Sequence, residues 1–186
     1  VPGAFLTLIG YLLLNQIVNE KGITKPADIL YDLHIGVRSA LKQDEEDSSS
    51  RDGMDLNCAT INMRTREVQY AGANNPLYIY QDWEIHEVKA TKKSIGGEQL
   101  EEERTFENHS FQLKEGDAIY MYTDGFVDQM GGPEEKRFGK RRFRDLVLRT
   151  QHESMKTQRA LLNLEWKDWK GDGEQLDDVT FFGMRL

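Results

Sequence analysis

The sequence predicts an α+β domain in which helices and an antiparallel sheet form separate layers. Three observations predict this class. Apolar residues recur at helical spacing before residue 42 and again between residues 140 and 171, whereas the segment between residues 54 and 123 alternates with a period of two. A chain of 186 residues is long enough for one domain with a core of its own. We therefore expect a single domain over residues 1–186.

Two helices are expected first. The run VPGAFLTLIGYLLLNQIV is the most apolar in the chain, but it is short for a membrane span and has no basic flank, so we interpret it as a buried core helix that Gly22 ends. The second helix can be capped by Thr24 and has Pro26 in its first turn. Its apolar face repeats every fourth residue, at Ile29, Leu33, Val37 and Leu41.

A loop and a series of strands come next. The segment 42–52 has no apolar period and indicates a mobile, exposed loop. The runs MDLNCATINM and EVQYAG, with RTR between them, predict a hairpin, and LYIYQDWEIHEV predicts another with its turn near Asp82. The runs TFENHSFQL and DAIYMYT, joined by a turn at Glu115–Gly116, extend the series to an antiparallel meander of about six strands.

The last elements are two helices and a strand. The helical period returns from Lys140 to Gly171, where glycines mark its end, and the chain closes with the strand VTFFGMRL. The net charge of −8, from 24 basic and 32 acidic residues, attracts neither nucleic acid nor an anionic membrane and suits cation binding. The single cysteine, Cys58, is expected to be a buried, inert thiol, and the chain is expected to be cytoplasmic or the cytoplasmic part of a membrane-bound sensor.

Two acidic segments share one design. The strand-like run YMYTDG ends in Asp124, with Asp128 four residues later, and LDDVTFF begins with Asp177 and Asp178. If these strands pair antiparallel, their carboxylates converge at one edge of the sheet, where a hard cation such as Mg²⁺ or Mn²⁺ would offset their repulsion. Gly125 would let the backbone approach that ion closely. On composition alone the alternative stays open that Asp124–Gly125 is a plain turn and Asp177–Asp178 caps a strand.

Five segments carry a resemblance to a known family. VPGAF, DGMDLNCATIN, YAGANNPLYIY, GDAIYMYTDGFVDQMGG and QLDDVTFFGMRL occur in the order found in bacterial phosphatases of the stage II sporulation protein E type. These belong to the metal-dependent type-2C serine/threonine phosphatase superfamily. The resemblance covers nearly the whole chain. It implies a layered antiparallel β-sandwich flanked by helices, in the order α-β-β-α.

The resemblance also implies a mechanism and a set of site residues. Members hold two divalent ions, Mn²⁺ or Mg²⁺, and a water that bridges them attacks phosphorus, so no catalytic side chain is expected. Asp124 and Asp177 match metal ligands of the family and Gly125 matches its turn glycine. Asp128 matches an acidic residue that orients metal waters or binds a further ion. Asp178 is expected to contact the metal ligands and not the metal itself.

The sequence departs from the family pattern at its start. In the family a first metal aspartate and an Asp-x-x-Gly-His-Gly segment come directly before the match to VPGAF, and this sequence begins at Val1. We therefore expect a partial domain without its first strands, weak or inactive as a phosphatase on its own. Its exposed sheet edge is expected to favour a homodimer. The resemblance is greatest to C-terminal output domains of longer sensor proteins.

Other residues invite weaker interpretations. Asn74 and Asn75 in GANNP are expected to line the substrate entrance or to form a plain loop. Asp52 and Asp55 are interpreted as scaffold. A basic patch follows Asp124, and its Arg137 and Arg141 are candidates for contact with a phosphorylated protein, although most charge runs are solvated faces. The patch consists of Lys136, Arg137, Lys140, Arg141, Arg142 and Arg144.

The function expected from these observations is hydrolysis of phosphoserine or phosphothreonine in a regulatory protein, such as an anti-sigma-factor antagonist, with an upstream sensor domain in control. The alternative is a non-catalytic regulatory or partner-docking module of the same fold. A simple cation-binding module is a weaker third possibility.

Overall fold

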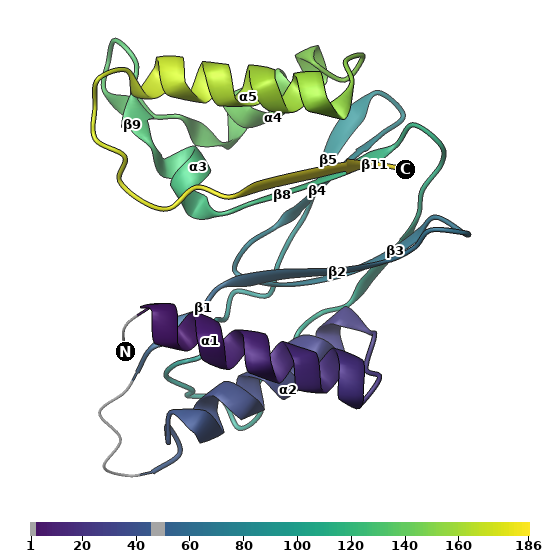
Figure 1. Ribbon diagram of the computed structural model, residues 1–186, viewed down its shortest axis with the longest axis vertical. Helices are drawn as coiled ribbons and strands as arrows, with labels where there is room; N and C mark the ends of the chain where they lie inside the picture. The colour runs from purple at the N-terminus through teal and green to yellow at the C-terminus, as the bar shows by residue number, and fades with distance from the viewer. Residues whose placement is uncertain (1–2, 46–50) are drawn as a thin grey trace. The chain divides into compact units, whose positions relative to one another are not determined.

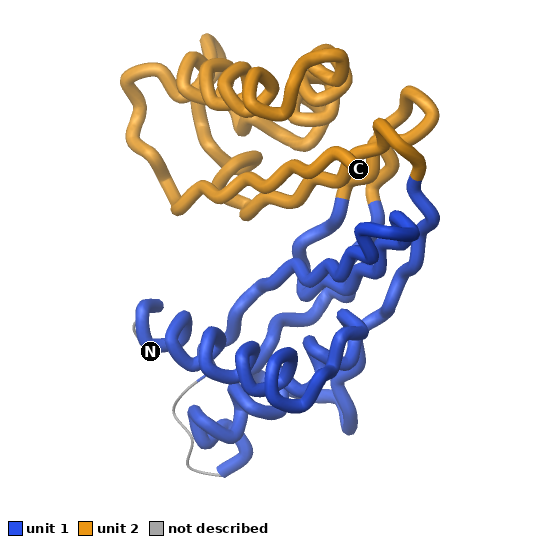
Figure 2. The backbone as a smooth tube through the Cα atoms, turned by 45° about the vertical axis from the view of Figure 1, so that its right-hand side comes forward, with its two compact units in different colours: residues 1–77, 88–113 blue, residues 78–87, 114–186 orange. Residues whose placement is uncertain are grey.

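The computed structural model describes residues 3–45 and 51–186, which form two compact units (Figures 1 and 2). Unit 1 consists of Val1–Leu77 and Val88–Leu113, and unit 2 consists of Tyr78–Glu87 and Lys114–Leu186. Each unit combines helices with antiparallel strands, as the predicted α+β class requires. The single domain over residues 1–186 stays a prediction. None of the described helices is long and apolar enough to cross a membrane.

The helices of unit 1 cover one face of its sheet (Figure 1). Helix α1 spans Gly3–Leu14 and continues into the π-helical segment η1, Asn15–Glu20, before α2 at Pro26–Ala40. Pro26 occupies the first turn of α2 as predicted, but the residue before the helix is Lys25 and no side chain caps it, so the predicted cap at Thr24 is wrong. Residues 42–44 form a turn after α2 and residue 45 a bend, and residues 46–50 of the predicted loop lie outside the described residues.

Helix α1 is not the buried core helix that its composition predicts. Its only buried residue is Gly10, and four large side chains are half exposed or more. One face packs on α2, where a Cβ at Gly36 would lie only 2.8 Å from Leu13 Cδ2, so the absence of a side chain permits the close approach. The opposite face stays exposed because no described element covers it. Its residues are Phe5, Leu8, Tyr11 and Leu12.

The sheet of unit 1 has the order β2-β3-β7. Strands β2, Leu56–Asn62, and β3, Glu67–Ala73, form the predicted hairpin, and the Asn62 side chain closes its turn by accepting the N–H groups of Arg64 and Thr65. Strand β7, His109–Gln112, pairs with the other edge of β3. The short strands β1, Gly53–Met54, and β6, Ile95–Gly96, pair separately. In β2, burial raises the pKa of the half-buried Cys58 thiol to about 11, which keeps it unreactive.

His34 joins α2 to the loop after β6. The ring is fully buried; its Nδ1 accepts the N–H of Gly96 at 3.0 Å and its Nε2 lies 2.8 Å from Gln99 Oε1. Because Nδ1 accepts, the proton of the neutral ring belongs on Nε2, which donates to Gln99. Burial lowers the pKa of His34, with help from the positive charges of Arg104 and Arg38, against the opposing effects of the Gln99 hydrogen bond and of the Glu101 charge.

This neutral histidine predicts that unit 1 loses stability in mild acid. The unfolded chain takes up a proton near pH 6.5 and the folded chain only at lower pH, so the free energy of unfolding falls as pH drops from 6.5 to the folded pKa. The slope is at most about 1.4 kcal/mol per pH unit. Urea unfolding between pH 7.5 and 5.5 measures it. The substitution His34→Asn keeps an acceptor for Gly96 but does not titrate; equal slopes for the two proteins would contradict the assignment.

Unit 2 contains a four-stranded sheet in the order β11-β8-β4-β5. The hairpin of β4, Leu77–Gln81, and β5, Glu84–Val88, turns at Asp82 and Trp83, both with positive φ, where the sequence predicts a turn. Strand β8, Ala118–Tyr122, runs antiparallel to both β4 and β11, Phe181–Arg185. The predicted turn at Glu115–Gly116 precedes β8.

The predicted single meander is wrong, because the strands belong to separate sheets. Strand β7 pairs with β3 and makes no ladder with β8, and β4 leaves the sheet of β3 altogether. The chain changes direction at Asn74, which has a φ of +62°, and Pro76 follows before β4 begins. A left-handed residue and a proline each interrupt a strand, so the alternating pattern on either side of them does not imply pairing.

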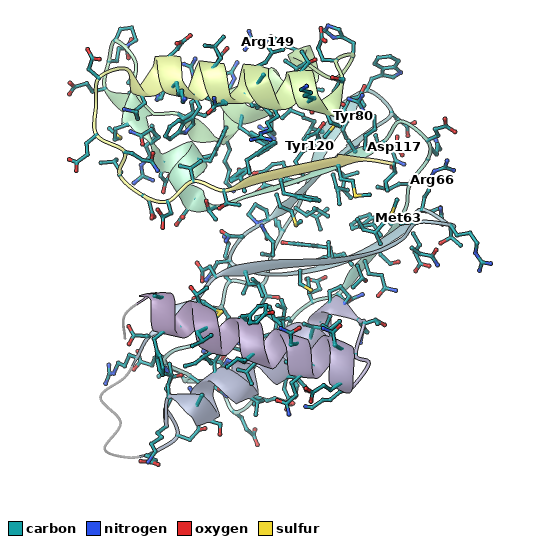
Figure 3. All side chains as sticks on the ribbon, viewed as in Figure 1. Met63, Arg66, Tyr80, Asp117, Tyr120 and Arg149 are labelled. Atoms are coloured by element: carbon teal, nitrogen blue, oxygen red, sulfur yellow. The ribbon has the colours of Figure 1, made fainter. Side chains whose placement is uncertain are left out.

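Helices α4, Gly139–Arg149, and α5, Met155–Lys170, cover one face of the unit 2 sheet (Figure 1). Ser154 caps α5 by accepting the Thr157 N–H, and Gly171 ends it with a φ of +55°. Tyr120 of β8 lies between the sheet and this helical layer (Figure 3), where its hydroxyl donates to Gln158. The remaining elements are α3, Asp124–Asp128; β9, Met130–Gly131; and β10, Lys136–Arg137.

Candidate metal centre

The two acidic segments meet at one edge of the unit 2 sheet. Asp124 begins α3 directly after β8 and Thr123, and Asp177 and Asp178 come shortly before β11. Strands β8 and β11 are antiparallel neighbours with Phe181 opposite Tyr122, so the end of one and the start of the other coincide. The predicted pairing of these two strands is therefore confirmed.

Gly125 lies against the second acidic segment. A Cβ built on Gly125 would lie 2.5 Å from the Asp178 carbonyl oxygen and 3.1 Å from Asp177 Cβ. The first distance is shorter than any ordinary contact, and the obstructing atom belongs to the backbone. Glycine at this position is thus required by close approach of the two segments, although its own backbone conformation is not left-handed.

Neighbouring main-chain N–H groups orient both carboxylates. Oδ1 of Asp124 accepts the Gly125 N–H at 3.0 Å, and Oδ1 of Asp177 accepts the Asp178 N–H at 2.7 Å. Asp124, Asp177 and Asp178 are all exposed at the surface of the unit. The arrangement leaves the carboxylates of Asp124 and Asp177 available to bind a cation, on two backbone segments that contact each other.

These residues fit a hard divalent cation that keeps much of its water. Mg²⁺ in particular is commonly held by one or two carboxylates, with water completing its octahedron. The donors are oxygen only, which favours Mg²⁺ or Mn²⁺ over softer ions. Within residues 3–45 and 51–186, no group of three or more His, Cys, Asp or Glu side chains is placed to hold a metal ion.

The other predicted residues of unit 2 have partners of their own. Oδ1 of Asp128 lies 3.1 Å from Arg137 Nη1, so the two residues form an exposed ion pair. Arg141 projects into solvent with its side chain 92% exposed, 3.9 Å from Asp145. Arg142 is packed instead of solvated: its guanidinium carbon lies 3.9 Å from the centre of the Trp169 ring. The roles predicted for Asp128, Arg137 and Arg141 stay predictions.

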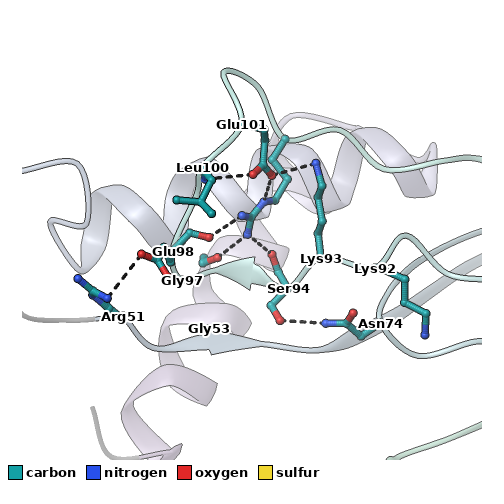
Figure 4. Close-up of a pocket in the computed structure, with 12 residues that line it drawn as sticks. Arg51, Gly53, Asn74, Lys92, Lys93, Ser94, Gly97, Glu98, Leu100 and Glu101 are labelled. Atoms are coloured by element: carbon teal, nitrogen blue, oxygen red, sulfur yellow. Dashed lines mark hydrogen bonds and ion pairs between the residues drawn. The ribbon is translucent and has the colours of Figure 1, made fainter.

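Asn74 and Asn75 belong to unit 1, where both take part in its own hydrogen bonding. The Asn74 amide donates to Asp55 Oδ1 at 2.8 Å and to Ser94 Oγ at 3.0 Å, and the Asn75 carbonyl accepts the Tyr70 hydroxyl. Asn74 also lines a pocket of about 480 Å³ (Figure 4). Asp55 is held within this network, in keeping with its interpretation as scaffold.

The comparisons with known proteins identify the family. The sequence model described as stage II sporulation protein E (SpoIIE) matches residues 2–186. The chain belongs to the SpoIIE family. A search of curated proteins returned no match.

Solved structures share the fold of this SpoIIE chain. The SiaA-PP2C domain of Pseudomonas aeruginosa has 29% identity and a TM-score of 0.86, over 100% of this chain and 71% of that one. The PP2C phosphatase domain with a fragment of the regulatory domain of SpoIIE from Bacillus subtilis has 20% identity and a TM-score of 0.71, over 100% and 50%. The RsbU and RsbW domains of Rv1364c from Mycobacterium tuberculosis have 24% identity and a TM-score of 0.72, over 100% and 48%. This chain thus spans about half the length of the last two.

These matches confirm the predicted family and fold class. The α+β fold with antiparallel sheets is that of type-2C phosphatases, and the SpoIIE chain is a phosphatase-type domain. Except for Val1, the match to the family model covers the same five segments that carry the resemblance in the sequence.

Two residues of this SpoIIE chain make structural contacts that the sequence did not lead us to expect. Arg104 looks like one charge among many in EEERTF, yet it is 6% exposed and donates to the carbonyls of Ser94, Gly96 and Glu98. Nothing in a single sequence distinguishes such a buried arginine from a solvated one. Thr123 is the second: its position directly before Asp124–Gly125 was a usable signal, because a hydroxyl beside an acidic turn has several backbone partners within reach.

Proposed function

We propose that this chain is a phosphatase domain that removes phosphate from phosphoserine or phosphothreonine in a protein, with Mn²⁺ or Mg²⁺ as cofactor. One observation carries the proposal: in a chain of the SpoIIE family, the segments of Asp124 and Asp177 meet at one sheet edge with both carboxylates exposed. The donor set and its exposure suit hard cations.

In this proposal the chain's own residues hold and orient the cofactor. Asp124 and Asp177 would bind the divalent ions, which when bound acidify and orient water and offset charge on the phosphoryl oxygens. The N–H groups of Gly125 and Asp178 each fix one carboxylate oxygen, so fewer rotamers must be ordered when a cation binds. Asp178 would support Asp177, and Asp128 would add negative charge nearby. No side chain is proposed as the nucleophile.

The substrate in this proposal is a phosphorylated regulatory protein, of which an anti-sigma-factor antagonist is one example. Arg137 and Arg141 are proposed to meet its phosphate or acidic surface, and Asn74 and Asn75 to line the entrance. Two similar structures support a regulatory setting, since one includes part of a regulatory domain and the other joins two domains in one protein. We place the domain in the cytoplasm, under an upstream sensor domain, with no role in nucleic-acid binding.

The 186 residues by themselves are proposed to be a slow enzyme, because no third His, Cys, Asp or Glu side chain of the described residues joins Asp124 and Asp177 to hold the ions. A non-catalytic docking module remains the second candidate. The observation in its favour is that no three acidic or histidine side chains of the described residues form a metal-holding group.

A paired measurement tests the function. Calorimetric titration with Mn²⁺ and Mg²⁺ is combined with release of phosphate from a phosphoserine peptide, for the 186-residue chain and for a longer chain that carries an Asp-x-x-Gly-His-Gly segment upstream. Metal binding by both, with turnover that EDTA abolishes and that is faster in the longer chain, is the expected result. If the longer chain binds phosphopeptide without turnover, the docking module is the better function.

A homodimer through the sheet edge is proposed on one observation. Strand β11 lies at the end of its sheet, with β8 as its only partner among the described strands. An open edge can pair with a second copy. Light scattering at rising protein concentration should show the dimer, and a constant monomer mass would reject it.

A further inference from the structure

We propose that Thr123 is a positioning residue for the metal centre: its hydroxyl holds the segment of Asp177 and Asp178 against the end of β8, beside Asp124. The inference rests on the proposed function and adds a residue to it that carries no charge and binds no metal. Three observations carry it, all within unit 2.

The first observation is where the β8–β11 ladder ends. Beyond the pair Phe181 and Tyr122, the Thr123 N–H donates to the Thr180 carbonyl at 3.0 Å. In a regular antiparallel pair the return bond runs from the Thr180 N–H to the Thr123 carbonyl. Here the Thr180 N–H donates instead to Thr123 Oγ1, at 2.9 Å. The side chain therefore takes the place of a main-chain acceptor at the last step of the ladder.

The second observation is the other bond of the same hydroxyl. Thr123 Oγ1 donates to the Asp178 carbonyl at 3.1 Å. A hydroxyl has one proton to donate, so this bond uses its whole donor capacity. The same carbonyl oxygen lies where a Cβ on Gly125 would come within 2.5 Å. The Asp178 carbonyl is thus held between the Thr123 side chain and the Gly125 backbone.

The third observation is a bond that Thr123 does not make. Thr123 is the residue before α3, with extended φ and ψ of −82° and 153°, a position where threonine usually accepts an N–H of the first helical turn. Its side chain makes no such capping bond. The hydroxyl reaches across to β11 instead of capping its own helix, so its contacts serve the junction of the two acidic segments.

These contacts link Thr123 to both carboxylates. On one side Asp124 follows Thr123 directly in the chain. On the other side the clamped residue is Asp178, whose N–H orients Asp177 Oδ1 at 2.7 Å. Loss of the hydroxyl would free the Asp178 carbonyl and the Thr180 N–H together and let the second segment move away from the first.

Isosteric substitution tests the proposed clamp, that is, the hold of the Thr123 hydroxyl on the segment of Asp177 and Asp178. Thr123→Val removes the hydroxyl and keeps the shape, and Thr180→Val is the matched control, because the bonds of Thr180 to Thr123 use its main chain. Calorimetry should show Mn²⁺ affinity at least about fivefold weaker for Thr123→Val, the equivalent of one lost hydrogen bond, and unchanged for Thr180→Val. Residue-resolved hydrogen exchange of the metal-free protein should show the Thr180 amide exchanging about tenfold faster only in Thr123→Val.

A second pair covers the case in which Thr123→Val does not fold. Thr123→Ser and Thr123→Ala differ by the hydroxyl alone, so serine should retain wild-type affinity and amide protection, and alanine should lose both. Equal affinity and equal exchange with and without the hydroxyl would overturn the clamp, as would a lower melting temperature with unchanged Mn²⁺ affinity. If the unsubstituted chain binds no Mn²⁺, the proposed function fails instead, and the exchange measurement alone decides whether Thr123 holds the two segments.

Discussion

Replacing Asp177 by asparagine is expected to weaken Mn²⁺ binding about a hundredfold, because it removes one of the two charges that hold the cation. The amide keeps the size of the side chain and can still accept the Asp178 N–H that orients it. The local fold should therefore survive, and the loss should be confined to metal affinity and to the phosphate release that depends on it. Calorimetric titration of the substituted protein measures the effect.

Asp172→Asn is the control for this substitution. Asp172 is exposed on the same connection between α5 and β11, and the change removes an equal charge from a residue that makes none of the contacts described for the proposed centre. It should leave Mn²⁺ affinity within a factor of about two, since exposed charges at a distance are screened. Equal losses at residues 172 and 177 would mean that general electrostatics, and not a site, attracts the metal.

The second large effect is expected in the core of unit 2. Phe143 of α4 is fully buried, and its ring centre lies 4.6 Å from that of Tyr122 and 5.3 Å from that of Tyr78, with Phe126 and Phe181 both at 5.9 Å. Phe143→Ala would leave a cavity among these rings and cost about 3–5 kcal/mol of unfolding free energy. Such a loss is a large share of the stability of an ordinary domain.

Tryptophan fluorescence during urea unfolding measures this loss selectively. All three tryptophans, Trp83, Trp166 and Trp169, belong to unit 2, so their signal reports on that unit. Leu148→Ala is the control on the same helix, because Leu148 is 40% exposed and should cost less than about 1.5 kcal/mol. A small effect at Phe143, or one no larger than at Leu148, would show that α4 is not packed as described.

Local patterns predicted most helices and strands, because the spacing of apolar residues within each element reflects its own geometry. The alternation in β2 and β3 predicted their hairpin, and Gly171 ended α5 where its type predicts. The convergence of Asp124 and Asp177 was also predictable, since it needs only two adjacent antiparallel strands with acids at matching ends. The sequence patterns do not show which segments of the chain pack against or pair with each other.

Two errors and one omission share that cause. Helix α1 is apolar on nearly every side, so its composition cannot tell which face a neighbour covers, and Phe5 and Tyr11 remain exposed. The alternation of apolar and polar residues in β7 is compatible with pairing to any strand. Only the structure shows that β7 pairs with β3. The Thr123 hydroxyl bonds to the Asp178 carbonyl, 55 residues away in the sequence, so its place beside Asp124 marks Thr123 as a candidate but does not identify its partner. Contacts between distant segments are decided by the whole chain.

The order of the strands along the chain has a consequence for any attempt to divide the gene. Two of the four strands in the unit 2 sheet, β4 and β5, are encoded between segments of unit 1, while β8 and β11 are encoded after residue 113. A polypeptide that starts at Lys114 would keep the acidic segments but lack half of the sheet that supports them. Recombination at that boundary would therefore separate the aspartates from their scaffold, and the two units have to be inherited as one genetic block.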